Sequence, residues 1–156
     1  MGMSLVRKVA INFGRAKALA ELLEDEAPKS CDLIWSLLPL EGKPFHSFES
    51  GREIFLQIPE PEPDIVPENQ TTHQIPGDLF IYYKPMIYIE PWWPEVKRQA
   101  AVVAFSYGRD TQVRGTYRPL AVNIVGKIVE GLEQLEDEAI RLRNEGVDKI
   151  SFTKVE

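Results

Sequence analysis

Arg52 and Glu53 form the adjacent pair of opposite charges that is best suited to chemistry in this sequence. A guanidinium can bind a carboxylate through two parallel hydrogen bonds, and Glu53 could orient Arg52 or receive an amine. Neighbouring residues of a strand point to opposite faces, so we expect only one of the two to enter a binding groove. The alternative interpretation is that both belong to a hairpin and face water.

A second set of cations surrounds a turn further along the chain. Arg109, Arg114 and Arg118 lie within ten positions and, together with Tyr107, could form a pocket for an anion. They could equally be solvated loop charges, which contribute little to stability. The ligand-binding candidates of the two stretches are therefore Arg52, Glu53, Tyr107, Arg109 and Arg114.

No residue stands out as catalytic, and His46 and Glu53 are weak candidates for that role. His46 lies between aromatic residues in a strand pattern, where histidine is more often a hydrogen-bonded core residue than a base. His46, His73 and the single cysteine give no spacing typical of zinc. We expect no metal and no cofactor, although a weak site with oxygen ligands is left open.

Residues 59–76 are predicted to form a long proline-rich loop, because each proline removes a backbone donor. Glu68 and Asn69, near its end, could close over a ligand or could cap a turn through side-chain hydrogen bonds. Whether the loop is a lid or disordered stays open. Trp92 and Trp93 between prolines could form a partner surface, and so a homo-oligomer, or could fold back onto the domain.

The composition predicts one globular domain over residues 1–156, with 44% hydrophobic and 27% charged residues. Residues 1–5 are expected to be disordered or to derive from expression. The net charge of −6 argues against a nucleic-acid partner. The start lacks the apolar core of a signal peptide, and no stretch approaches the ~20 apolar residues that span a bilayer. With one cysteine, these features predict a cytoplasmic protein with no membrane partner.

Apolar residues recur at helical spacing in two stretches, one that begins at Pro28 and one that ends at a glycine cap, Gly146. The segment 111–119 is predicted to be a loop with few core residues, and Gly126 a bulge or close approach within a strand. Many strands without a βαβ rhythm favour an antiparallel barrel or sandwich with helices on its ends. Strands are predicted at 9–13, 16–23, 45–48, 53–58, 79–83, 86–90, 100–107, 120–129 and 149–155.

Three segments, in the correct order, resemble the cyclophilin family and cover about two-thirds of the chain. The matching residues are Glu21-Leu22, Asp25, Pro28-Lys29-Ser30 and Phe45-His46, then Pro76-Gly77-Asp78-Leu79, then the run from Val125 to Leu132. The resemblance implies a mainly β fold, a closed eight-stranded antiparallel barrel capped by two helices. The sequence is more similar still to small bacterial cyclophilin-like proteins of uncharacterised function than to the active prolyl isomerases.

The departures from the family concern its active site. Ser47 stands where prolyl isomerases have their catalytic arginine, directly after Phe-His. Arg52 and Glu53 stand where the family has the Phe and Met of its apolar proline pocket, and Phe55 replaces a glutamine. Efficient prolyl isomerase activity is therefore not expected.

The leading hypothesis is a barrel that binds a small anionic metabolite or peptide in a groove beside it, touched by Arg52 and by Arg109 or Arg114. Two other classes of function stay open. One is an enzyme, either a weak prolyl isomerase or a small-molecule hydrolase or isomerase that uses Glu53 with His46. The other is a structural or oligomerisation module that uses Trp92 and Trp93.

Overall fold

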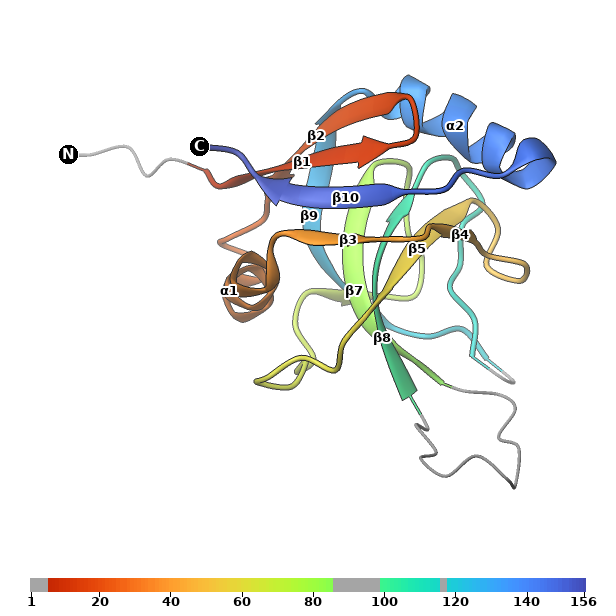
Figure 1. Cartoon of the computed structure of the whole chain (residues 1–156). Coiled ribbons are helices and arrows are strands. Elements are labelled where there is room, and N and C mark those ends of the chain that lie inside the picture. The colour runs from red at the N-terminus through yellow and green to blue at the C-terminus, as the bar shows by residue number, and fades with distance from the viewer. Residues whose placement is uncertain (1–5, 86–98, 116–117) are drawn as a thin grey trace, which may run out of the picture.

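An antiparallel sheet of ten strands, curled into a half-barrel, dominates the computed structural model, which describes residues 6–85, 99–115 and 118–156 (Figure 1). Two helices lie at its ends. In chain order the elements are β1 (Lys8–Phe13), β2 (Ala16–Leu22), α1 (Pro28–Leu37), β3 (Leu40–Gly42), β4 (Phe45–His46), β5 (Glu53–Ile58), β6 (Gln70–Thr71), β7 (Asp78–Pro85), β8 (Gln99–Ser106), β9 (Val122–Glu130), α2 (Leu132–Glu145) and β10 (Ile150–Lys154).

The strand order in the sheet is β3-β10-β1-β2-β9-β7-β8-β5-β4, with β6 paired to β9, and every pairing is antiparallel. The prediction of a mainly β fold with two helices is confirmed. The prediction of a closed barrel of eight strands is wrong, because the described residues form ten strands and the edge strands β3 and β4 do not pair. The predicted strand at 86–90 lies outside the described residues.

The concave side of the sheet holds the main core. Alternate residues of β1 and β2 point into it, and the aromatic rings of Phe13 and Phe105 meet edge to face with their centroids 6.0 Å apart. α2 covers one end of this core with Leu135 and Ala139, both 0% exposed, and α1 covers another side with Ile34. Both predicted helices are confirmed, and Pro28 occupies the first turn of α1 as expected.

A second, smaller core lies on the convex side of the sheet. Phe55, Phe80 and Tyr82 pack there beneath Val113, which is 1% exposed, and beside Leu120. As predicted, the described residues of 111–119 form a loop with few core residues, and Val113 is the one that belongs to the second core. As predicted, Gly126 marks an irregularity of β9, because the register with β7 shifts directly beside it and a Cβ there would lie 3.1 Å from the Glu21 carbonyl oxygen.

The loop 59–76 packs against α1, and Glu68 fixes it there. Its two carboxylate oxygens accept hydrogen bonds from the backbone N–H groups of Lys29 (3.2 Å) and Ser30 (2.7 Å). Buried Asn123 of β9 donates to the Ser30 hydroxyl and to the Val66 carbonyl. Of the two interpretations of Glu68, capping is therefore the one that the structure supports, although the capped element is α1 and not a local turn.

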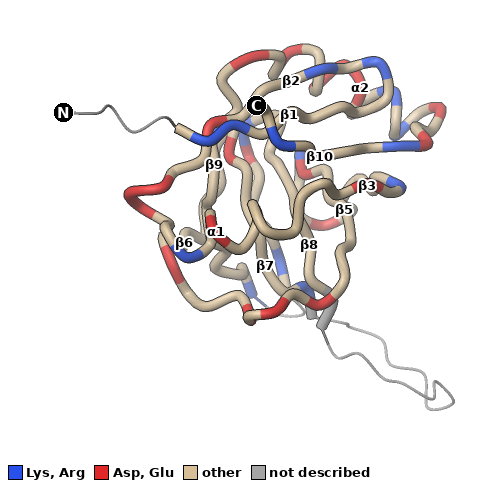
Figure 2. Tube along the Cα trace, turned by 60° about the vertical axis from the view of Figure 1, so that its left-hand side comes forward, with Lys and Arg blue, Asp and Glu red and all other residues tan. Residues whose placement is uncertain are grey.

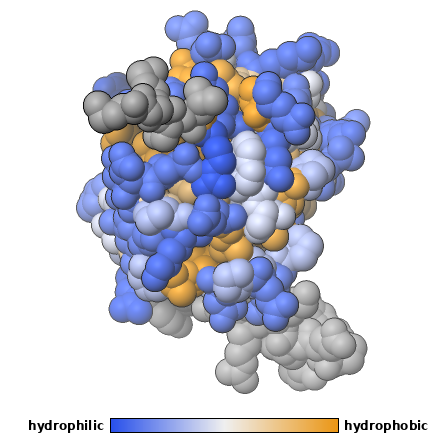
Figure 3. Space-filling model, turned by 90° about the vertical axis from the view of Figure 1, so that its left-hand side faces the viewer, coloured by the Kyte–Doolittle hydropathy of each residue, from blue (hydrophilic) through white to orange (hydrophobic). Residues whose placement is uncertain are grey.

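The face that carries α1 is mostly hydrophilic, with separate apolar areas (Figure 3). No helix in the described part of the chain is both long and apolar enough to cross a membrane.

Candidate functional site

A cleft of about 880 Å³ lies between the C-terminal half of α2 and the segment that contains β4 and the turn before β5. In Figure 1 this is the side where the end of α2 lies above β4 and β5. We call it the α2–β4 cleft. Its lining residues are Lys43, Pro44, Phe45, His46, Ser47, Phe48, Gly51, Arg52, Asp110, Leu142 and Arg143.

Positive charge predominates in this cleft. Lys43, Arg52 and Arg143 line it, against one acid, Asp110. The Arg52–Asp110 pair is 3.7 Å apart and its side chains are 49% and 83% exposed, so it is a weak, solvent-screened contact. The loop 59–68 differs, because all of its charged residues are acidic, and Figure 2 marks the acidic and basic positions along the chain trace. The cleft therefore favours an anion.

Arg52 is held in a defined position at the cleft wall. Its Nη1 donates to the backbone oxygen of Arg109 at 2.7 Å, and its side chain lies across Gly108. A Cβ at position 108 would come within 2.3 Å of the Arg52 Cδ, so the absence of a side chain there makes room for the guanidinium stem. Because this bond goes to a neutral carbonyl and the contact with Asp110 is long and exposed, Arg52 can still pair with the charge of a ligand.

His46 joins the cleft to the core through Tyr107. The His46 Nε2 and the Tyr107 hydroxyl are 2.6 Å apart, and Nδ1 lies 2.7 Å from the Ser47 carbonyl oxygen. Burial lowers the pKa of His46, the Ser47 contact opposes that change, and the charge of Arg143 adds to the lowering. A neutral imidazole follows, which can donate or accept a hydrogen bond but adds no positive charge to the cleft at pH 7.

Glu53 points to the other side of the sheet. It is 0% exposed, and its Oε2 accepts a hydrogen bond of 2.6 Å from the Tyr82 hydroxyl. Burial raises the pKa of Glu53, while Tyr82, the charge of Lys84 and the hydroxyls of Ser50 and Ser47 oppose the rise. The expectation that only one of the pair Arg52 and Glu53 enters the groove agrees with this geometry, whereas the alternative that both face water does not.

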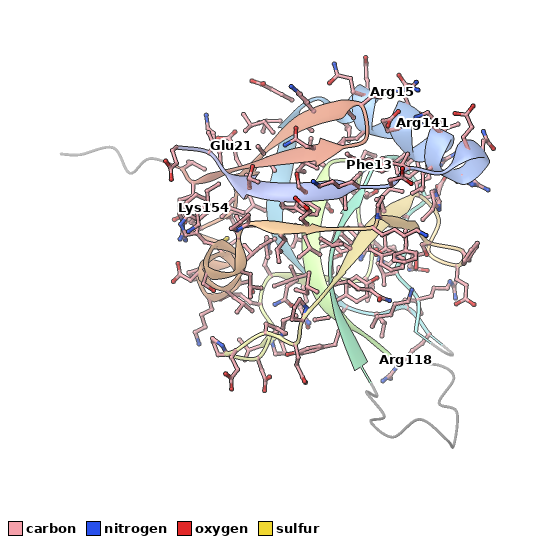
Figure 4. The ribbon with its side chains drawn as sticks, viewed as in Figure 1. Phe13, Arg15, Glu21, Arg118, Arg141 and Lys154 are labelled. Carbon is pink, nitrogen blue, oxygen red and sulfur yellow. The ribbon has the colours of Figure 1, made fainter. Side chains whose placement is uncertain are left out.

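The other predicted residues are spread over the surface. Tyr107 is buried behind His46, and the side chains of Arg109 and Arg114 are exposed and do not line the cleft. Arg118 lies far from Arg141 and the α2 end of the molecule in Figure 4. Asn69 donates to the Ile124 carbonyl oxygen at 3.0 Å, beside the Glu68 cap. Trp92 and Trp93 lie outside the described residues.

Sequence reasoning missed Lys43, Arg143 and Phe48 as cleft residues. Arg143 is recognisable in the sequence only as a basic residue near the end of the second predicted helix, and its distance along the chain from β4 gives no sign that the two meet. Phe48 was recognisable only as an aromatic residue after the Phe-His pair, yet its side chain is fully exposed, at 103%, on the cleft wall. Among the described residues, no three His, Cys, Asp or Glu side chains are grouped so that they could hold a metal ion.

The antiparallel half-barrel with two helices is a cyclophilin-like fold, and two solved structures share it. McbB in complex with tryptophan superimposes with a TM-score of 0.67 at 18% identity, over 93% of this chain and 44% of McbB. The hypothetical protein AF2241 from Archaeoglobus fulgidus gives a TM-score of 0.57 at 19% identity, over 99% of this chain and 100% of its own.

The chain belongs to the family described as protein of unknown function DUF3830, whose model matches residues 9–154. A search of the curated proteins found no match. At identities of 18% and 19% the two structures show the fold alone, and this chain spans less than half of the length of McbB.

Proposed function

We propose that this protein binds a small molecule or peptide that carries a carboxylate or another anionic group, and that the ligand occupies the α2–β4 cleft. The observation that supports it is the gathering of Lys43, Arg52 and Arg143 around one cavity with a single exposed acid. A guanidinium can hold a carboxylate with two parallel hydrogen bonds, which gives both energy and orientation. A volume of about 880 Å³ is sufficient for a ligand of metabolite size.

Exposed aromatic rings suggest the rest of the ligand. Phe45 is 40% exposed and Phe48 is 103% exposed, and both line the cleft. Exposed aromatic side chains beside cations suit a ligand with an apolar or aromatic body and an anionic end. McbB was solved with tryptophan, so aromatic amino acids and aromatic carboxylates belong in the first set of ligands to be tried.

We propose in addition that the protein is not an efficient prolyl isomerase. Ser47 stands in the place of the family's catalytic arginine and Arg52 in the place of an apolar pocket residue. A coupled prolyl isomerisation assay at high protein concentration should give no rate above that of buffer, and a clear catalysed rate would contradict the proposal.

Thermal scanning with a library of carboxylates tests the binding proposal. A ligand at 100 times its Kd should stabilise the protein by about 2.7 kcal/mol, which corresponds to a rise in Tm of roughly 5–10 °C for a chain of this size. Arg52→Ala should abolish most of this rise. Arg109→Ala is the matched control, because it removes the same charge from an exposed side chain outside the cleft. No stabilising ligand, or equal effects of the two variants, would contradict the proposal.

A further inference from the structure

The convex side of the sheet contains a carboxyl group with one oxygen that lacks a partner. Glu53 begins β5 and shares its face with Phe55 in the second core. Its Oε2 is bonded to Tyr82, but no hydrogen-bond partner for Oε1 exists among the described residues. Buried polar atoms are nearly always paired, because an unpaired one loses its bonds to water without replacement. An unpaired oxygen on a fully buried acid therefore needs an explanation.

The groups around Glu53 do not supply a counter-charge by direct contact. The titratable side chains that act on it are Tyr82 and Lys84, both from β7. The Lys84 ammonium lies over the Phe55 ring, 4.1 Å from its centroid, and makes no ion pair with Glu53 in the described structure. Lys84 therefore packs on the ring of Phe55 and does not pair with the Glu53 carboxyl. Burial raises the pKa of Glu53 in this setting.

The segment 47–50 links the surroundings of this carboxyl with the α2–β4 cleft, because Ser47 and Ser50 act on Glu53 and Ser47 lines the cleft. The Ser47 backbone N–H donates to the Glu53 carbonyl oxygen at 3.0 Å, so the two residues lie directly opposite one another on adjacent strands. Directly opposed residues of an antiparallel pair point to the same face, and the Ser47 hydroxyl influences the Glu53 carboxyl accordingly. Ser47 also lines the cleft. Its hydroxyl accepts a hydrogen bond from the Ser50 backbone N–H at 3.0 Å. Of the residues that act on Glu53, which are Tyr82, Lys84, Ser50 and Ser47, Ser47 is the one that also lines the cleft.

We infer that the α2–β4 cleft is built for a zwitterion, an amino acid or the free amino end of a peptide, whose ammonium group is held by Ser47 with Glu53 behind it. This inference rests on the proposed function, in which Arg52 and Arg143 hold the carboxylate. The Ser47 hydroxyl accepts a hydrogen bond from the ammonium and donates one to Glu53 Oε1. Glu53 is thereby a positioning residue that acts through Ser47 and need not touch the ligand.

Binding of the ammonium is coupled to loss of the Glu53 proton. A nearby positive charge favours the carboxylate over the neutral acid, so the ammonium lowers the pKa that burial has raised, and a proton held by the carboxyl passes to solvent as the ligand enters. The resulting carboxylate accepts hydrogen bonds from Tyr82 and from Ser47, and its negative charge compensates the ammonium. The unpaired Oε1 of the ligand-free protein is the acceptor that this bound state uses.

Isothermal titration calorimetry of the full chain with three matched compounds tests the inference. Phenylalanine has both charged groups, 3-phenylpropanoate lacks the ammonium, and phenethylamine lacks the carboxylate. Each is titrated at pH 7 in phosphate and in Tris, whose different ionisation enthalpies reveal proton release. Phenylalanine should bind about tenfold more tightly than either partial analogue, which is about 1.4 kcal/mol. Proton release should accompany only the two compounds that carry an ammonium group, and 3-phenylpropanoate should show none.

Glu53→Gln separates the inference from the proposed function. The amide has nearly the same shape and keeps an oxygen for Tyr82, so the variant should fold. It should bind 3-phenylpropanoate like the wild type but lose the tenfold preference for phenylalanine and its proton release. If Glu53→Gln fails to fold, Ser47→Ala should show the same loss of preference.

The three possible failures are distinct. Equal binding of phenylalanine and 3-phenylpropanoate without proton release would overturn the zwitterion inference and leave the anion site standing. An unchanged preference in both Glu53→Gln and Ser47→Ala would overturn the role of Glu53. Binding of none of the three compounds would count against the proposed function and the inference together.

Discussion

Glu138 and Glu53 are both buried glutamates, yet their surroundings are opposite in character. Glu138 of α2 is 6% exposed and accepts two hydrogen bonds from Arg141, at 2.7 and 2.8 Å, and one from the backbone N–H of Arg15 at 2.9 Å. Arg15 and Arg141 lie close together at the end of the β1–β2 hairpin in Figure 4. Glu53 has one hydrogen bond and an unpaired oxygen.

The two pKa values follow from these surroundings. The hydrogen bonds from Arg141 hold the pKa of Glu138 below its usual range, whereas burial raises that of Glu53. Glu138 is therefore an ionised structural residue that joins α2 to the hairpin. Glu53 resembles a group that is kept incomplete until something binds, because its Oε1 has no hydrogen-bond partner among the described residues. The hydrogen bonds of Glu138 stabilise the fold, whereas Glu53 keeps one oxygen that can still accept a hydrogen bond.

The largest expected effect concerns the close contact around Glu138. Gly14 has φ of +55°, and a Cβ there would lie 2.0 Å from Glu138 Oε2 and 2.9 Å from a methyl of Val147. Gly14→Ala should therefore combine backbone strain with displacement of Glu138, at a cost of roughly 3 kcal/mol. Chemical denaturation measures it. Gly146→Ala is the matched control, with φ of +90° but nothing within 4 Å of the new Cβ, and it should cost only about 1 kcal/mol. Equal costs would show that Glu138 is not held tightly.

A smaller effect is expected at Glu68, a third glutamate with a structural task. It supplies the N-terminal cap of α1, whose Ala27 has no capping side chain of its own. Glu68→Gln should lower the free energy of unfolding by about 1 kcal/mol, measured by urea denaturation at pH 7. Glu62→Gln removes an exposed acid of the same loop and should be neutral. If neither variant changed the free energy of unfolding, Glu68 would not be a structural carboxylate.

The sequence predicted the helices better than the sheet edges, for a physical reason. α1 and α2 have local signals, Pro28 at one start and Gly146 at the other end, whose meaning does not depend on distant residues. β3 and β6 contain three and two residues, and they are strands only because β10 and β9 lie beside them. A short stretch of sequence gives no information about a partner strand that lies far away along the chain.

The candidate site could likewise be predicted only where local signals were sufficient. Strand alternation correctly separated Arg52 from Glu53, but it could not show which face would be covered. The cover over Glu53 comes from the second core, to which Val113 of the predicted loop 111–119 and Leu120, at the start of a predicted strand, contribute. Arg143 reaches the cleft from a helix about one hundred positions away along the chain. Those contacts are long-range, and alternation and motif order hold no information about them.

The smallest expected effect is a difference in pH dependence. In the interval between the ordinary glutamate pKa and the raised pKa of Glu53, the folded protein keeps a proton that the unfolded chain has lost, so stability falls as pH rises. Glu138 acts in the opposite direction, because its lowered pKa makes its contribution disappear as pH falls below the ordinary glutamate pKa. Denaturation between pH 3 and pH 8 should show that Glu53→Gln gains stability relative to wild type as pH rises. Glu138→Gln should lose stability relative to wild type over the same rise.

The most direct test is a ¹³C NMR titration of the glutamate carboxyl carbons, with the signals of Glu53 and Glu138 assigned through Glu53→Gln and Glu138→Gln. The carboxyl of Glu53 should titrate above the ordinary glutamate pKa of about 4.3, and that of Glu138 below it. On addition of a ligand with an ammonium group, the Glu53 signal should move to its ionised position at constant pH. A Glu53 carboxyl that titrates at or below the ordinary value without ligand would contradict the distinction between the two buried acids.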